Sequence, residues 1–124
     1  MEKKLYQALY ETLSDVLPTG WKRIVYYAQY FEGSYSMKYY VDSGNGKYID
    51  CFSLGIGKKE IIDVFIKMDK LIAEERAHLP EKKKWTVMTM SINEKGRFKV
   101  NYDYEDISDN TISYTREWKK KYLV

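Results

Sequence analysis

Apolar and polar positions alternate along this chain in two ways, one typical of helices and one typical of strands. Between residues 5 and 16, leucine and valine recur three or four positions apart, which predicts an amphipathic helix that Pro18 ends. A longer helical pattern begins at Lys58 and is ended by Pro80. A short third helix is predicted over residues 113–122, where Trp118 and Tyr122 are four apart and share one side.

The strongest strand pattern covers residues 22–41. Two runs rich in tyrosine and β-branched residues are joined by Glu32-Gly33, which is the sequence form of a β-hairpin. In the second run an apolar set that includes Met37 and Val41 alternates with a set that mixes serine and lysine with Tyr40, so the two faces of this strand differ. Further strands are predicted over residues 48–54, 87–92 and 98–104, with a hairpin loop at 93–96.

These elements follow one another in the order αβββαββα. Hairpin-connected strands grouped between helices predict an α+β fold with a mainly antiparallel sheet of about five strands and with helices packed on one face. A chain of 124 residues is of the size of one domain, so we expect a single domain over residues 1–124.

The composition limits the classes of protein that fit. One cysteine excludes an internal disulfide, and no stretch is apolar and long enough for a secretion signal or a membrane span. We therefore expect a soluble, cytoplasmic protein. The 21 basic and 18 acidic side chains give a net charge of only +3, whereas 13 tyrosines are unusually many. Because tyrosine combines a large apolar ring with a polar tip, it is used both in cores and in recognition surfaces.

Candidate catalytic groups are few and scattered. His78 is the only histidine and stands at a predicted helix end, where a capping or surface role is expected. Cys51 is expected to be a buried small side chain. The glycine pairs 44/46 and 55/57 continue into no phosphate-binding motif and are expected to form turns. The sequence thus predicts no enzyme, no metal site and no cofactor.

The C-terminal third carries a recognisable signature. Residues 96–109 read GRFKVNYDYEDISD and are followed by Tyr114, Arg116, Trp118 and Lys121-Tyr-Leu123. Together with the first helix, Leu17-Pro18 and Trp21, and the tyrosine-rich hairpin, this signature resembles the YezG-like immunity proteins. The resemblance implies a non-enzymatic antitoxin that binds and neutralises the effector domain of a cognate toxin, one of the polymorphic toxins that Gram-positive bacteria export by type VII secretion. Several toxins met by this family are nucleases.

For such a partner the sequence offers the polar face of the last strand and the acidic segment over residues 103–109. Arg97, Lys99, Asn101 and Asp103 alternate with apolar residues and should meet solvent or a partner. The predicted partner-binding residues are tyrosines of the sheet and carboxylates of the acidic segment: Tyr26, Tyr40, Tyr102, Asp103, Glu105, Asp106 and Asp109. For the three tyrosines, packing in the core is an equally good interpretation.

Two other functions fit the same residues. Tyrosines beside Lys38, Lys47, Arg97 and Lys99 could stack on bases and neutralise phosphates, so a small single-stranded nucleic-acid-binding module is the main alternative. Interspersed acidic residues such as Asp42 and Asp50 would interrupt that positive track. A structural module that has lost its toxin is a third hypothesis and predicts the same fold.

Overall fold

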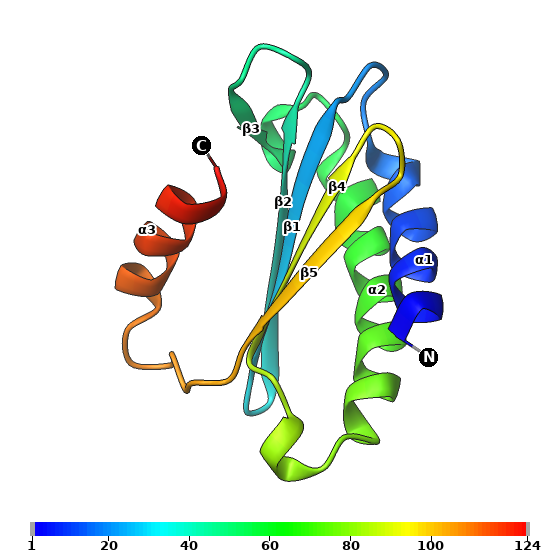
Figure 1. The fold of residues 1–124 in the computed structure, drawn as a ribbon. Coiled ribbons are helices and arrows are strands. Elements are labelled where there is room, and N and C mark those ends of the chain that lie inside the picture. Colours follow the sequence, from blue (N-terminus) through cyan, green and yellow to red (C-terminus); the bar gives the residue numbers. More distant parts are fainter. Residues whose placement is uncertain (1, 124) are drawn as a thin grey trace. The chain divides into compact units, whose positions relative to one another are not determined.

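A computed structural model describes residues 2–123 of the chain. The described part contains three α-helices and a five-stranded antiparallel sheet in the order αβββαββα, as Figure 1 shows. This confirms the predicted α+β class, element order and strand number. The contacts divide the chain into two compact units, residues 1–19 with 51–84 and residues 20–50 with 85–124. The expected single domain stays a prediction.

The first unit is helical. Helices α1 (Glu2–Leu13) and α2 (Lys58–Ala77) pack together and run in opposite directions (Figure 1). Their apolar stripes are buried at Leu9 and Leu13 of α1 and at Ile61, Val64, Phe65, Met68 and Ile72 of α2. A 3-10 turn over Ser14–Val16 continues α1 up to Leu17-Pro18, where proline prevents further helix. In the part of the chain that the structure describes, no helix has the length and apolarity needed to cross a membrane.

The second unit consists of the sheet and helix α3. The strands are β1 (Arg23–Phe31), β2 (Ser34–Asp42), β3 (Tyr48–Asp50), β4 (Val87–Asn93) and β5 (Phe98–Asp103). Their order across the sheet is β3-β2-β1-β4-β5, and each adjacent pair is antiparallel. The predicted hairpin therefore forms the centre of the sheet. Gly33, with φ of 77°, provides the positive φ at its turn.

The third strand is shorter than the sequence predicts. We expected it to run from residue 48 to 54, but β3 ends at Asp50 and residues Cys51–Ser53 form a 3-10 turn. In this turn the backbone N–H of Leu54 donates to the carbonyl of Cys51 at 3.5 Å. The turn takes the place of the predicted continuation, and the ladder between β3 and β2 consists of three residue pairs.

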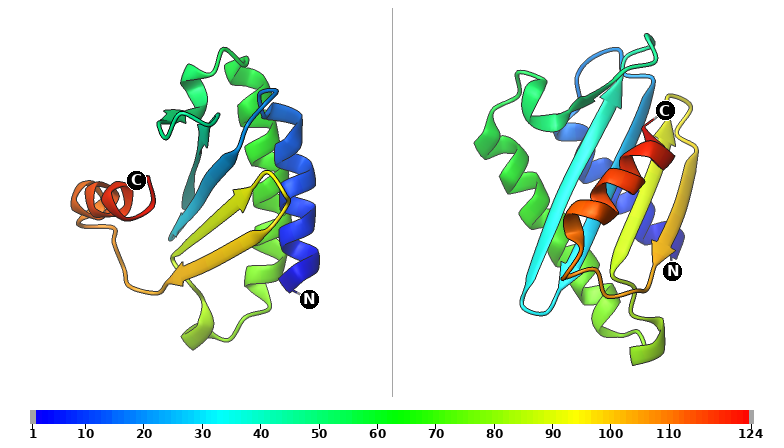
Figure 2. Two further views of the ribbon diagram at one scale, coloured as in Figure 1. Left: turned by 45° about the horizontal axis from the view of Figure 1, so that its top comes forward. Right: turned by 90° about the vertical axis from the view of Figure 1, so that its left-hand side faces the viewer.

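Helix α3 (Thr111–Tyr122) lies across one face of the sheet, as both views of Figure 2 show. It begins two residues before the predicted residue 113. Its buried residue Trp118 forms a small core with Val25, Tyr27 and Tyr40 of the central hairpin, and Tyr122 packs at the margin of that core. The predicted pairing of Trp118 with Tyr122 on the buried side of this helix is confirmed, with ring centroids 5.3 Å apart.

Candidate functional site

The strand register decides which residues face α3. Val25 of β1 is opposite Ser91 of β4, which in turn is opposite Lys99 of β5. Side chains of directly paired residues point to the same face of a sheet. The polar side chains of β5, from Lys99 to Asp103, therefore lie on the face that carries Val25 and that α3 covers. The face that we expected to meet solvent or a partner is thus partly occupied by the chain's own C-terminal helix.

One aromatic side chain fixes α3 on this face. The Trp118 ring meets Tyr27 edge-on, with centroids 4.8 Å apart, and Tyr40 at 5.8 Å. Its indole Nε1–H donates a hydrogen bond of 2.9 Å to the Thr89 hydroxyl oxygen. Because Thr89 is itself buried, this bond satisfies a polar group that would otherwise be costly inside the protein. Trp118 thereby ties the helix to β1, β2 and β4 at once.

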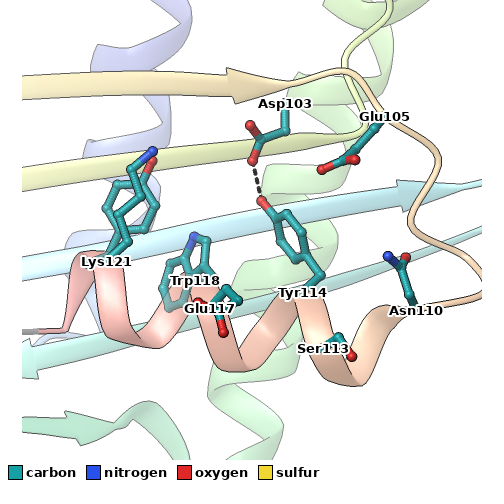
Figure 3. A pocket seen from close by; sticks show the side chains of 9 residues that line it. Asp103, Glu105, Asn110, Ser113, Tyr114, Glu117, Trp118 and Lys121 are labelled. Carbon is teal, nitrogen blue, oxygen red and sulfur yellow. Dashed lines mark hydrogen bonds between the residues drawn. The ribbon is translucent and has the colours of Figure 1, made fainter.

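A second link joins the start of α3 to the end of β5. The Tyr114 hydroxyl donates to an Asp103 carboxylate oxygen, as the dashed line in Figure 3 shows. Burial raises the pKa of Tyr114 well above its ordinary value, and the hydrogen bond to Asp103 raises it further. Tyr114 therefore stays protonated and donating throughout the neutral range. The two contacts of Trp118 and Tyr114, four residues apart, fix one side of the helix to the sheet.

Beside these contacts lies a hollow of about 340 Å³. Figure 3 shows the side chains that surround it, which come from the end of β5, the following connection and one side of α3. The lining residues are Asp103, Glu105, Asn110, Ser113, Tyr114, Glu117, Trp118, Lys121 and Tyr122. Three of the nine are acidic and one is basic, and three aromatic rings form its apolar part. Such a mixture of rings and charges is typical of sites where proteins are recognised.

The acidic connection between β5 and α3 is held in place by its backbone. The Thr86 hydroxyl donates to the carbonyl oxygens of Asp103 at 3.1 Å and Glu105 at 2.6 Å. Ile107 is buried, with 1% of its surface exposed, and anchors the middle of the segment. Glu105, Asp106 and Asp109 are exposed around this anchor, so their carboxylates project from an attached segment.

Not all of the predicted site residues share one surface. Tyr26 is completely buried and Tyr40 is 4% exposed, so neither ring is presented to a partner in this chain. The register places Tyr26 and Tyr102 on the sheet face opposite that of Tyr40. Tyr102 is half-buried and its ring lies 5.4 Å from that of Trp85. The role of these three tyrosines in binding stays a prediction.

The acidic residues, in contrast, lie together. Asp103, Glu105, Asp106 and Asp109 fall within one short stretch that borders α3, and Asp103 and Glu105 line the hollow. Two of them also have structural bonds, because Asp103 accepts from Tyr114 and Asp106 accepts the Ser108 backbone N–H at 3.0 Å. Hydrogen bonds from Ser108 lower the pKa of Asp106. Within residues 2–123 no such bond restricts the side chains of Glu105 and Asp109.

Sequence reasoning missed the structural role of the Asp42 carboxylate. Its side chain is 3% exposed and accepts hydrogen bonds from Arg23 at 2.6 Å and 3.1 Å. The backbone N–H groups of Gly44 and Gly46 donate to its other oxygen at 2.8 Å and 3.1 Å. The Arg23 guanidinium first, and then the Gly44 amide, lower the pKa of Asp42. The expected turn at these glycines is confirmed, and an aspartate followed by two glycines was the available signal for its structure.

The remaining candidate residues have structural places. The ring Nδ1 of His78 lies 2.7 Å from the carbonyl oxygen of Glu74 at the end of α2, and Cys51 is fully buried. These positions agree with the expected capping and packing roles. Within residues 2–123 the structure contains no group of three or more histidine, cysteine, aspartate or glutamate side chains arranged to hold a metal ion.

Comparison with known proteins finds one family and two relatives that bear nearly the same description. Residues 2–124 match the model of a family described as "Immunity protein YezG-like". A relative from Bacillus spizizenii, named immunity protein YezG, is 21% identical over 110 residues, covering 83% of this chain and 68% of the relative. The protein of the same name from Bacillus subtilis is 26% identical over 112 residues, covering 83% of this chain and 73% of its own length.

Proposed function

We propose, from the premise that this chain belongs to the YezG-like immunity protein family, that it binds the effector domain of a cognate secreted toxin and neutralises it by covering its surface. The observation that carries this proposal is the family match, which spans residues 2–124 and so includes both units and the acidic connection. An immunity role follows from the family itself. The identity of the partner and the way it is bound are our inference.

The acidic connection is the part of the surface that we propose as the main contact. Glu105, Asp106 and Asp109 are exposed on a segment that Thr86 and the buried Ile107 hold in place. A segment that is already ordered loses little conformational entropy when a partner binds, which favours affinity. Carboxylates at the rim of an interface also speed association with a basic surface. These features support tight binding without any reaction.

The toxin that we propose is a polymorphic toxin exported by type VII secretion, with the present protein acting in the cytoplasm of the producing cell. A nuclease effector fits the acidic connection well, because a nuclease must present cationic groups to phosphates, and these groups would be attracted to Glu105 and Asp109. On this account inhibition is steric and electrostatic. The protein then needs no catalytic group.

The test uses the cognate toxin domain, which we expect the reading frame next to this gene to encode. We expect the two chains to co-purify as a complex, and we expect the complex to melt at a higher temperature than either chain alone, since each partner binds only the folded form of the other. Cells that express the toxin domain should survive only when the present chain is made as well.

A matched pair of variants makes the test specific. Glu105→Lys with Asp109→Lys should abolish protection, whereas Asp15→Lys with Glu74→Lys, which makes the same change in charge on the helical unit, should protect like the wild type. All four side chains are exposed. Failure of the wild-type chain to bind the toxin domain or to protect cells would refute the proposed function.

A further inference from the structure

A second hollow lies on the same face of the sheet, at the other end of α3. It has a volume of about 380 Å³ and is bordered by β1, β4, β5 and the last turn of α3. Its lining includes Arg23, Tyr48, Arg97, Lys99, Lys121 and Tyr122. Four of them are cationic and none is acidic. A hollow of this size accommodates a few side chains of a partner.

Three of the four cations are available to a ligand. Arg97, Lys99 and Lys121 are exposed, and within residues 2–123 no carboxylate lies within ion-pair distance of them. Arg23 differs, because Asp42 already holds its guanidinium at 2.6 Å. Unpaired cations gathered around one concave surface create a positive potential that attracts an anionic group.

Two tyrosine rings that line this hollow, those of Tyr48 and Tyr122, lie beside cations. The Lys121 Nζ lies 5.2 Å from the centroid of the Tyr122 ring, and the Arg23 guanidinium lies 5.3 Å from that of Tyr48. Rings in this position attract the cations through their negative faces and keep them near the surface. The hollow therefore combines apolar contact area with hydrogen-bond donors, and its tyrosines and arginines are residue types that are enriched at the hot spots of protein interfaces.

The two hollows adjoin, since both are lined by Lys121 and Tyr122. Along β5 the acidic end begins at Asp103 and the basic end reaches Arg97, a separation of six residues or about 20 Å of extended strand. One side of α3 thus borders a surface that is negative at the start of the helix and positive at its end. A nucleic-acid strand, which is negative throughout, would be repelled at the acidic end.

We infer that the basic hollow receives an acidic segment of the toxin domain, while the acidic hollow and connection contact basic residues of the same toxin. This inference rests on the proposed function and adds the chemistry of the partner. The contact surface of the toxin carries carboxylates where it meets the basic hollow and cations where it meets the acidic hollow. A protein partner can complement both signs over this distance, and opposite charges arranged in this way fix the orientation of binding.

The experiment compares two charge-reversed proteins that differ in where the charges lie. In the first, Lys99→Glu and Lys121→Glu place two carboxylates in the basic hollow. In the control, Lys82→Glu and Lys119→Glu make the same change in charge outside the basic hollow. Lys119 also lies in the last turn of α3, but it lines a different depression, together with Ile112 and Arg116. Circular dichroism and melting temperature establish that both variants fold. Affinity for the toxin domain is measured by calorimetry at two salt concentrations.

We expect the first variant to bind the toxin domain at least about tenfold more weakly than the control, with a smaller dependence on salt than the wild type. Equal affinities of the two variants, with the wild type still binding, would overturn this inference and leave the proposed function intact. Loss of binding by the wild type itself would overturn the proposed function. A single-stranded oligonucleotide is the second probe, and absence of binding to the wild-type chain supports the inference. If the oligonucleotide binds in a salt-sensitive way, and the variant with Lys99→Glu and Lys121→Glu no longer binds it, the inference is overturned in favour of a nucleic-acid ligand.

Discussion

Trp118 and Thr89 lie 29 residues apart in the chain and are joined by a buried hydrogen bond of 2.9 Å from the indole Nε1–H to the hydroxyl oxygen. This bond sets the position of α3 along β4, because an indole has one polar donor and the buried surface around it offers this acceptor. The ring contacts with Tyr27 and Tyr40 then determine its tilt. Both hollows border α3, so their shape depends on this pair.

Removal of the acceptor should show how much the pair contributes to stability. Thr89→Val keeps the shape but leaves the buried indole N–H unpaired, and we expect a loss of about 1–3 kcal/mol in the free energy of unfolding. Thr89→Ser keeps the hydroxyl and should cost less. Trp118→Ala removes the whole ring and should cost about 3–5 kcal/mol. Urea unfolding followed by circular dichroism measures all three, and equal losses for Thr89→Val and Thr89→Ser would argue against a role for the hydrogen bond.

The link between Tyr114 and Asp103 predicts sensitivity to alkali. Burial, and then the Asp103 carboxylate, raise the pKa of Tyr114 above its ordinary value of 10.0. The stability that the neutral hydroxyl contributes is therefore complete below about pH 10 and is lost as the pH rises above it. Tyr114→Phe should be less stable than the wild type at pH 7, and the difference should shrink between pH 9 and pH 11.

Urea midpoints measured at matched pH values test this prediction. The other tyrosines ionise in both proteins, so their effect on stability cancels in the difference between wild type and Tyr114→Phe. A stability difference between wild type and Tyr114→Phe that is constant from pH 7 to pH 11 would show that the hydroxyl ionises as freely in the folded chain as in the unfolded one.

Asp42 predicts the opposite dependence, at acid pH. Hydrogen bonds from Arg23 and from Gly44 lower its pKa below the ordinary 3.8. Its contribution to stability is therefore present above that pH and is lost as the pH falls through the lowered pKa. Asp42→Asn should be less stable than the wild type at pH 7, and its stability should depend less on pH between 5 and 2. Thermal midpoints over this range provide the measurement, and parallel curves for the two proteins would contradict the prediction.

Three of the four acidic residues at the connection between β5 and α3, namely Asp103, Glu105 and Asp109, should separate into two classes. Glu105→Lys with Asp109→Lys should weaken toxin binding and leave the melting temperature nearly unchanged, because neither side chain holds the fold. Asp103→Lys should lower the melting temperature as well, since it leaves the Tyr114 hydroxyl without its acceptor. Melting temperature and toxin affinity measured on the same protein samples distinguish these effects. A large drop in melting temperature for the Glu105 and Asp109 variant would mean that the connection is mainly structural.

Local patterns in the sequence predicted most of the elements. The central hairpin follows from alternation and from the Glu32-Gly33 turn, and the side of α3 that is buried follows from the spacing of Trp118 and Tyr122. These signals are local because turn geometry and side-chain periodicity involve neighbouring residues. The family resemblance was also recognised from the sequence and is confirmed by the match over residues 2–124.

The arrangement of the surface could not be predicted in the same way. Nothing in the sequence near Tyr40 shows that Trp118, 78 positions later, would cover it, and Thr89, which accepts the hydrogen bond of Trp118, is 29 positions away from it. The basic hollow combines Arg97 and Lys99 with Lys121, which only the packing of α3 brings to one place. Patterns with period two assign a residue to a face, but they do not say which helix will cover that face.

The central claim is that this chain inactivates a toxin by covering it, and a titration tests the claim most directly. The activity of the purified cognate toxin domain would be measured while the folded wild-type chain is added in known amounts. The account predicts that activity falls in proportion and disappears at one equivalent. Full activity in the presence of an excess of folded chain would contradict it.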